Sequence, residues 1–137
     1  PLDILKDPQY AYDKSKIDSL CRDKWEKRGK VDRRMFRFCK KMQKRGHRSL
    51  FRLIKKRKKL AWISDLMPVI WNKWTKRGIT DYSMVHFSLN REVEGFLDYE
   101  YETKQSDYDA YKMKRCSAKW RSHENPWSMT MYCYKKM

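Results

Sequence analysis

The stretch DRRMFRFCKKMQKRG, residues 32–46, combines apolar side chains at helical spacing with a dense set of positive charges. Its apolar residues recur every three or four positions, which places them on one face of an α-helix. They are Met35, Phe38, Cys39 and Met42. Asp32 is a residue type favoured at a helix N-cap. The stretch therefore predicts a helix over about 32–45 whose outer surface carries the cations.

The chain of 137 residues has a formal net charge of +17, and most of that charge surrounds this helix. Residues 21–60 hold 19 Lys and Arg against 3 acidic residues, whereas residues 81–111 hold 2 basic and 8 acidic ones. Such a concentration of like charge repels itself unless a polyanion is near, and nucleic acid is the commonest one. The predicted nucleic-acid contacts are Arg33, Arg34, Arg37, Lys40, Lys41, Lys44, Arg45, Arg48, Lys55, Lys56, Arg57, Lys58 and Lys59.

Four aromatic residues among the basic helices are candidates for stacking on unpaired bases, provided that they are exposed. They are Trp25, Phe36, Phe51 and Trp62. An aromatic residue at helical spacing more often belongs to the core, and we favour that interpretation. Nothing in the sequence specifies a base, so DNA and RNA stay open as partners.

Three further helices are predicted in the first eighty residues. The apolar spacing favours helices over about 14–28, 49–60 and 65–77. Three segments end in Lys-Arg-Gly, at Gly29, Gly46 and Gly78. Basic residues in the last turn followed by glycine are a helix C-terminal signal, so we expect helices to stop at these glycines. The flanking residues show no fixed period, and we attribute the recurrence to convergent capping rather than to an internal repeat.

After Gly78 the hydrophobic pattern changes from helical to alternating. Odd positions in Glu92–Thr103 are largely apolar and even positions largely acidic, which is a strand pattern, and Asn90-Arg91 is a plausible turn. We therefore expect a β-hairpin near 81–103, a helix over about 106–121 and a closing strand over 127–134. A helical interpretation of Glu92–Thr103 stays open, because glutamate is a good helix former.

The predicted fold class is mainly α with a small β element, with an all-α fold as the alternative. We expect a single domain over 1–137, made of a basic helical part (1–80) and a charge-neutral α/β part (81–137). At this length and aromatic content a compact core is expected rather than a disordered basic tail.

The cysteines and the N-terminus bear on the cellular compartment. Cys21, Cys39, Cys116 and Cys133 form no C-x-x-C pair, so no structural metal is expected. Pro1-Leu2-Asp3 does not resemble the start of a signal peptide, and no apolar run reaches the roughly 20 residues of a membrane span. We accordingly expect four reduced thiols in an intracellular protein without a transmembrane segment.

The principal functional hypothesis is a non-enzymatic protein that binds DNA or RNA phosphates without a cofactor. The alternative is a small basic accessory subunit or inhibitor that binds an acidic protein surface within a large assembly. Ser49-Leu50-Phe51-Arg52 resembles the L-Y-R helix start of small basic mitochondrial accessory proteins. That resemblance extends the alternative to organellar and viral assemblies.

A second alternative is enzymatic. Glu102-Thr103-Lys104 at the end of the predicted strand, with an acidic residue upstream and a helix after it, resembles the PD-(D/E)xK nuclease family. The resemblance implies that Asp81 and Glu102 hold a divalent metal and that Lys104 helps to orient the attacking water. The other interpretation is that the acidic strand is a solvated surface with no metal, and we prefer it.

Overall fold

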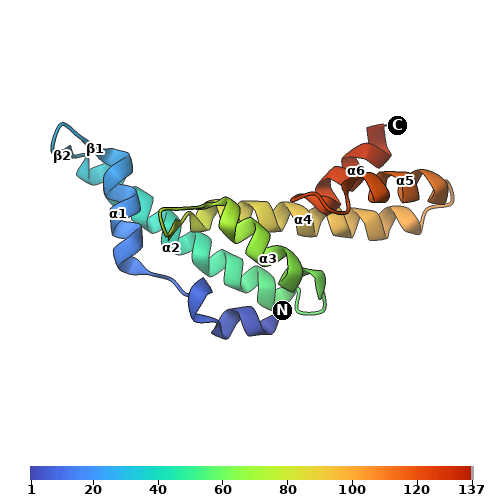
Figure 1. Cartoon of the computed structure of the whole chain (residues 1–137), viewed down its shortest axis with the longest axis horizontal. Helices are drawn as coiled ribbons and strands as arrows, with labels where there is room; N and C mark the ends of the chain where they lie inside the picture. The colour runs from blue at the N-terminus through green and yellow to red at the C-terminus, as the bar shows by residue number, and fades with distance from the viewer. Residues whose placement is uncertain (137) are drawn as a thin grey trace. The chain divides into compact units, whose positions relative to one another are not determined.

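The computed structural model describes residues 1–136 and is mainly helical with a small β element, which confirms the predicted fold class (Figure 1). Two 3-10 helices, η1 (Leu2–Lys6) and η2 (Pro8–Tyr10), come first. The α-helices are α1 (Lys14–Trp25), α2 (Arg33–Lys56), α3 (Trp62–Lys73), α4 (Tyr82–Thr103), α5 (Ala110–Trp120) and α6 (Pro126–Lys136). The strands are β1 (Glu26–Lys27), β2 (Lys30–Val31), β3 (Thr75–Lys76) and β4 (Ile79–Thr80).

The β element consists of two short hairpins, each placed between a short helix and a long one. β1 pairs with β2 and β3 with β4, both antiparallel. Each hairpin turns on an Arg-Gly pair with φ of 54° and 76°, and two positive φ angles define the type I′ turn that suits the twist of paired strands. Gly29 and Gly78 therefore close hairpins, and the preceding helices end earlier, at Trp25 and Lys73.

An internal repeat underlies this arrangement. KWEKRGKVD (residues 24–32) and KWTKRGITD (residues 73–81) share six of nine residues at a separation of 49. Each segment supplies the end of a short helix, the hairpin, and the aspartate at the start of a long helix. The recurrence is therefore a repeat of one helix–hairpin–helix motif, and its attribution to convergent capping was wrong.

α2 is one helix where the sequence suggested two. It continues through Gly46, which was expected to stop it. A Cβ atom on Gly46 would lie 2.8 Å from the Cα atom of Ser83, so this glycine allows the start of α4 to approach the backbone of α2. Glycine serves here for close packing rather than for a left-handed helix end.

α4 replaces the β-hairpin expected near 81–103, and α6 replaces the strand expected over 127–134. Val85, Leu89 and Val93 are buried at intervals of four residues, which is the spacing of a helix face. Asp81 starts the helix, because its carboxylate accepts a hydrogen bond from the backbone N–H of Met84 at 3.1 Å. Glutamate is compatible with a helix, and the burial of Glu92 against the start of α6 favours the helix over the alternating pattern.

The chain divides into two compact units, residues 1–87 and 88–137, with the boundary inside α4. In the first unit the buried side chains come from η1, η2, α1, α2, α3 and the start of α4; they include Ile4, Tyr10, Ile17, Leu50, Ile54, Ile63, Met67, Ile70 and Val85. In the second unit Met113, Cys116, Met131 and Tyr134 form a buried cluster between α5 and α6. The boundary lies close to the predicted change in charge at residue 80.

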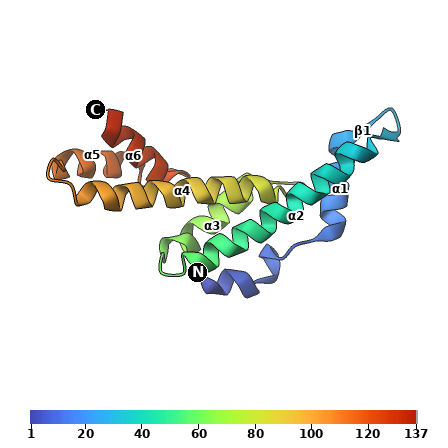
Figure 2. The ribbon, with the colours of Figure 1, turned by 180° about the vertical axis from the view of Figure 1, so that it is seen from behind.

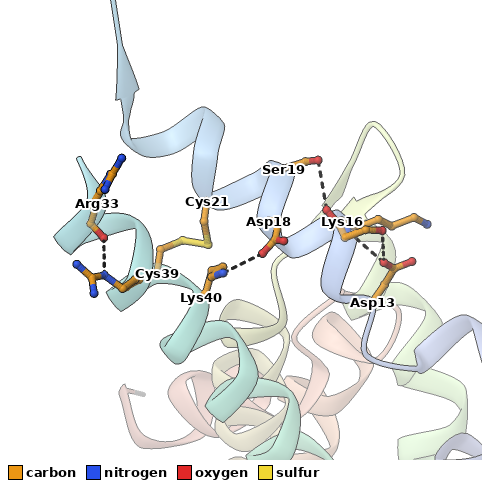
Figure 3. A network of polar contacts seen from close by, with 10 residues as sticks. Asp13, Lys16, Asp18, Ser19, Cys21, Arg33, Cys39 and Lys40 are labelled. Atoms are coloured by element: carbon orange, nitrogen blue, oxygen red, sulfur yellow. Dashed lines mark hydrogen bonds and ion pairs between the residues drawn. A yellow bond between two sulfur atoms is a disulfide. The ribbon is translucent and has the colours of Figure 1, made fainter. Parts of the chain in front are cut away.

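All four cysteines are paired, which corrects the expectation of free thiols. Cys21 of α1 is bonded to Cys39 of α2 (Figure 3), and Cys116 of α5 is bonded to Cys133 of α6. Both disulfides join two helices that follow one another in the chain and contact each other. Cys21 and Cys39 were expected on apolar helix faces, where a buried free thiol is ordinary, so the local pattern does not reveal their pairing.

In each unit a buried polar side chain accepts a hydrogen bond from the backbone at the start of a helix, α4 in the first unit and α6 in the second. In the first unit, Gln43 accepts a hydrogen bond from the backbone N–H of Tyr82 at 2.8 Å and donates to Asp81 at 2.9 Å. In the second unit, the fully buried Glu92 accepts from the backbone N–H groups of Trp127 at 2.8 Å and Ser128 at 3.2 Å. Gln43 and Glu92 are 49 residues apart, so the repeat extends from sequence to packing.

Candidate nucleic-acid interface

α2 positions most of the predicted contact residues on one element. Within Arg33–Lys56 there are 11 Lys and Arg and no Asp or Glu. One side of the helix is buried through residues such as Cys39, Gln43, Leu50 and Ile54. The cations occupy the remaining surface, because their spacing places them away from that buried face. The helix therefore presents to solvent a surface that is rich in cations and has no acidic side chain.

The predicted contacts differ in how accessible they are. Those on α2 that are exposed are Arg33, Arg34, Arg37, Lys41, Lys44, Arg45, Arg48, Lys55 and Lys56. Lys58 and Lys59 are exposed in the turn that follows α2. Lys40 and Arg57 are half-buried. Lys40 pairs with Asp18 of α1 at 3.3 Å (Figure 3) and lies 4.8 Å from the Phe36 ring centroid, so it contributes to the packing of α1 on α2.

The start of α2 is fixed by local contacts. The Asp32 carboxylate accepts a hydrogen bond from the backbone N–H of Met35 at 3.1 Å, and the Cys21–Cys39 disulfide ties the first turns to α1. Within the helix, the Nε–H of Arg37 donates to the carbonyl oxygen of Arg33 at 3.4 Å (Figure 3). The N-terminal cap and the disulfide therefore restrict the backbone that carries the cations at this end of α2.

η1 lies beside the C-terminal half of α2 (Figures 1 and 2). A groove of about 440 Å³ is found at this half of the helix. Its lining residues are Leu5, Tyr12, Lys44, His47, Arg48, Phe51, Arg52 and Lys55. Three of the four cations in this lining were predicted contacts, and Arg52 was missed. The spacing of Arg52 relative to Arg48 and Lys55 is a signal that identifies it, since all three share one side of a helix.

The four aromatic residues considered for stacking are all half-buried. Phe51 lines the groove. Phe36 is covered by cations, with the guanidinium of Arg22 5.4 Å and the ammonium of Lys40 4.8 Å from its ring centroid. Tyr12, which precedes α1, also lines the groove, and no helical pattern in the sequence singles it out.

His47 joins the groove to the core of the first unit. Its Nε2–H donates to the carbonyl oxygen of Tyr10 at 2.7 Å, and its ring centroid lies 4.3 Å from that of Phe51. Burial lowers the pKa of His47 below its usual value, and the bond to the Tyr10 carbonyl opposes this to a smaller extent. The imidazole is therefore neutral at neutral pH and acts as part of an apolar floor.

The residues suggested by the nuclease resemblance do not come together as the predicted hairpin required. Asp81 precedes the first residue of α4, and Glu102 lies in its last turn, so the helix separates them by about 30 Å along its axis. Asp81 is engaged by Gln43 and by the backbone of Met84. Lys104 follows the helix and is exposed. Within residues 1–136, no group of three His, Cys, Asp or Glu is placed to hold a metal ion.

Comparison of the chain with protein-family models, curated proteins and solved structures gave no match. None of the helices in residues 1–136 is both long enough and apolar enough to cross a membrane.

Proposed function

We propose that the protein binds nucleic acid through the positive surface of α2 and the turn that follows it. The observation that carries the proposal is a 24-residue helix with 11 basic and no acidic side chains, most of them exposed. Phosphate contacts from such a surface give affinity and register but little sequence information. Binding is therefore electrostatic, and the protein needs no cofactor for it.

Salt dependence tests this mechanism. On duplex DNA, log affinity falls with log salt by about 0.9 for every phosphate contact, because each contact releases a condensed counterion. We expect a steep fall in affinity for duplex DNA and structured RNA between about 50 and 200 mM salt, measured by fluorescence anisotropy. An affinity that does not change over this range contradicts the proposal.

A matched pair of variants locates the interface. Arg37, Lys41, Lys44 and Arg48 are exposed on α2, and their joint replacement by Gln removes four charges. Lys114, Arg115, Lys119 and Arg121 are exposed in or directly after α5, and their replacement by Gln removes the same number. The α2 variant should lose affinity for all sequences and show a shallower salt slope. Equal losses in the two variants would show that net charge matters and the α2 surface does not.

The two disulfides favour a second candidate function. Disulfides are typical of proteins that fold in oxidising compartments, whereas the sequence suggested a reducing one. In such a compartment, a subunit or inhibitor that binds an acidic protein surface becomes a plausible role for the same cations. The ratio of absorbance at 260 and 280 nm after purification at low salt distinguishes the two. Co-purified nucleic acid supports the first function, and a clean preparation retained by one acidic protein supports the second.

A further inference from the structure

The groove beside α2 combines an aromatic floor with a cationic edge. The ring centroids of His47 and Phe51 lie 4.3 Å apart, with an angle of 36° between the ring planes. The ring centroid of Tyr12 lies 5.7 Å from that of His47. Phe51 and Tyr12 are half-buried, so part of each ring is open to the groove. The volume of about 440 Å³ is within the range of sites that hold a small organic group.

The edge of the groove is a row of cations along α2. Lys44, Arg48, Arg52 and Lys55 are exposed and follow one another at intervals of three or four residues. Such a step corresponds to about 4.5–6 Å along the helix axis. Among the described residues that line the groove, none is acidic. The groove thus offers a repeated positive charge beside a continuous apolar strip.

We propose that this groove binds single-stranded nucleic acid, with a base stacked on Phe51 and Tyr12 and successive phosphates along the row of cations. The inference rests on the proposed function and adds the substrate class. Bases in a duplex are stacked on each other and their faces are hidden, whereas an unpaired base offers its face to an aromatic side chain. A row of four cations matches a polymer of phosphates rather than one nucleotide.

Replacing Phe51 with Leu tests the stacking contact, because Leu keeps an apolar side chain and removes the ring. Calorimetric titration is performed with a short oligothymidylate and with linear polyphosphate, which has the charge but no bases. Loss of one stacked base corresponds to about a 5- to 150-fold loss of affinity. We expect a loss in this range for the oligonucleotide and a change of less than about twofold for polyphosphate.

Phe38→Leu is the matched control. Phe38 lies on the same helix, is 55% exposed and does not line the groove. The affinity of the Phe38→Leu variant for the oligonucleotide should therefore equal that of the wild type. Circular dichroism of both variants establishes that they are folded. If Phe51→Leu does not fold, the wild-type protein is cross-linked to an oligonucleotide containing bromouracil, and the attachment site is mapped by mass spectrometry to Tyr12 or Phe51.

The outcomes separate this inference from the function on which it rests. If the wild type binds neither oligonucleotide nor polyphosphate, the proposed function is wrong and the inference falls with it. If both polyanions bind and Phe51→Leu affects them equally, or cross-links map away from the groove, the surface binds phosphates without stacking. Equal affinity for thymidine monophosphate and the oligonucleotide would also overturn the assignment to a strand.

Discussion

His47 occupies the position in the first unit that Phe96, 49 residues later, occupies in the second. The His47 ring meets Tyr82 with centroids 4.8 Å apart at 72°, and the Phe96 ring meets Trp127 at 4.8 Å and 75°. The two units therefore contain an equivalent edge-to-face ring contact, made by an imidazole in the first unit and by a phenyl ring in the second. The difference makes the first unit sensitive to pH, because histidine titrates and phenylalanine does not.

Replacing His47 with Phe should reduce that sensitivity. Burial lowers the pKa of His47 in the folded state, so the unfolded chain binds more protons once the pH falls below about 6.5. Stability is full above this pH and falls below it, by at most about 1.4 kcal/mol per pH unit for one group. The pKa of His86 is also lowered by burial, so part of the slope should remain in His47→Phe. Urea unfolding between pH 7.5 and 5.5 measures both slopes.

A control and a contradiction follow from the same titration. Phe38→Leu changes an exposed residue of the same helix and no imidazole, so it should keep the pH dependence of the wild type. At pH 7.5, His47→Phe should also lose about 1 kcal/mol, because the carbonyl of Tyr10 loses its donor. Identical pH dependence in His47→Phe and the wild type would show that this imidazole does not titrate on unfolding.

Gly46 and Gly95 give a second prediction at the scale of single residues. Gly→Ala in an exposed helix normally gains up to about 1 kcal/mol. Here a Cβ atom on Gly46 would lie 2.8 Å from the Cα of Ser83, and one on Gly95 would lie 2.8 Å from the backbone nitrogen of Ser128. We expect each Gly→Ala variant to lose about 1–3 kcal/mol of unfolding free energy in urea, as overpacked sites do.

Lys41→Ala is the control for these variants, because Lys41 is exposed on α2 and its replacement should change stability by less than about 0.5 kcal/mol. A gain of stability in Gly46→Ala or Gly95→Ala would mean that the helices separate at little cost.

At the scale of elements, the disulfides bear on both stability and compartment. Cys21–Cys39 closes a loop with a sequence separation of 18, and Cys116–Cys133 one of 17. A loop of this length is associated with about 3 kcal/mol of stabilisation in the chain-entropy description. We expect protein produced under oxidising conditions to have no titratable thiols, and Cys21→Ser/Cys39→Ser to lose about 3 kcal/mol in urea unfolding. Four reactive thiols in the folded wild type would contradict this pairing and restore the reducing compartment suggested by the sequence.

The elements also show what the sequence can and cannot predict. The four N-terminal helical regions were anticipated from apolar spacing, although the two over 32–45 and 49–60 are one helix. α4 was missed because Val93, Leu97 and Tyr101 fit a period of two as well as a period of four. Burial of Glu92 against the start of α6 favours the helix, and that contact spans 35 residues. Local pattern alone does not contain it.

The candidate interface also has one part that the sequence predicts and one part that it does not. Its cations were predictable, because charge can be counted in the sequence and α2 places the charges together. The groove was not, because it requires Leu5 and Tyr12 to lie against residues more than thirty positions later in the chain. The repeat lay in the sequence throughout, in the match between residues 24–32 and 73–81. Its structural meaning depends on the hairpins, which are too short to give a strand pattern.

At the scale of the whole molecule, the two units differ in charge. Residues 1–87 hold 25 basic and 9 acidic side chains, and residues 88–137 hold 9 basic and 8 acidic ones. In the second unit, acid and base also pair directly, as Lys135 does with Asp98, whose hydrogen bond raises the pKa of that lysine. Self-repulsion should therefore destabilise the first unit and spare the second.

Hydrogen exchange followed by peptide mass spectrometry tests this difference, because it reports the stability of each unit separately. Raising the salt concentration from about 10 to 100 mM shortens the Debye length from about 30 to 10 Å and weakens repulsion among exposed charges. We expect exchange to slow for peptides from α2 and α3 and to stay constant for peptides from α5 and α6. Polyphosphate at low salt should give the same pattern more strongly, since a ligand that binds the folded first unit stabilises it by mass action. Equal slowing in both units would mean that salt strengthens hydrophobic packing in general. Repulsion among the cations of α2 would then not be what destabilises the first unit.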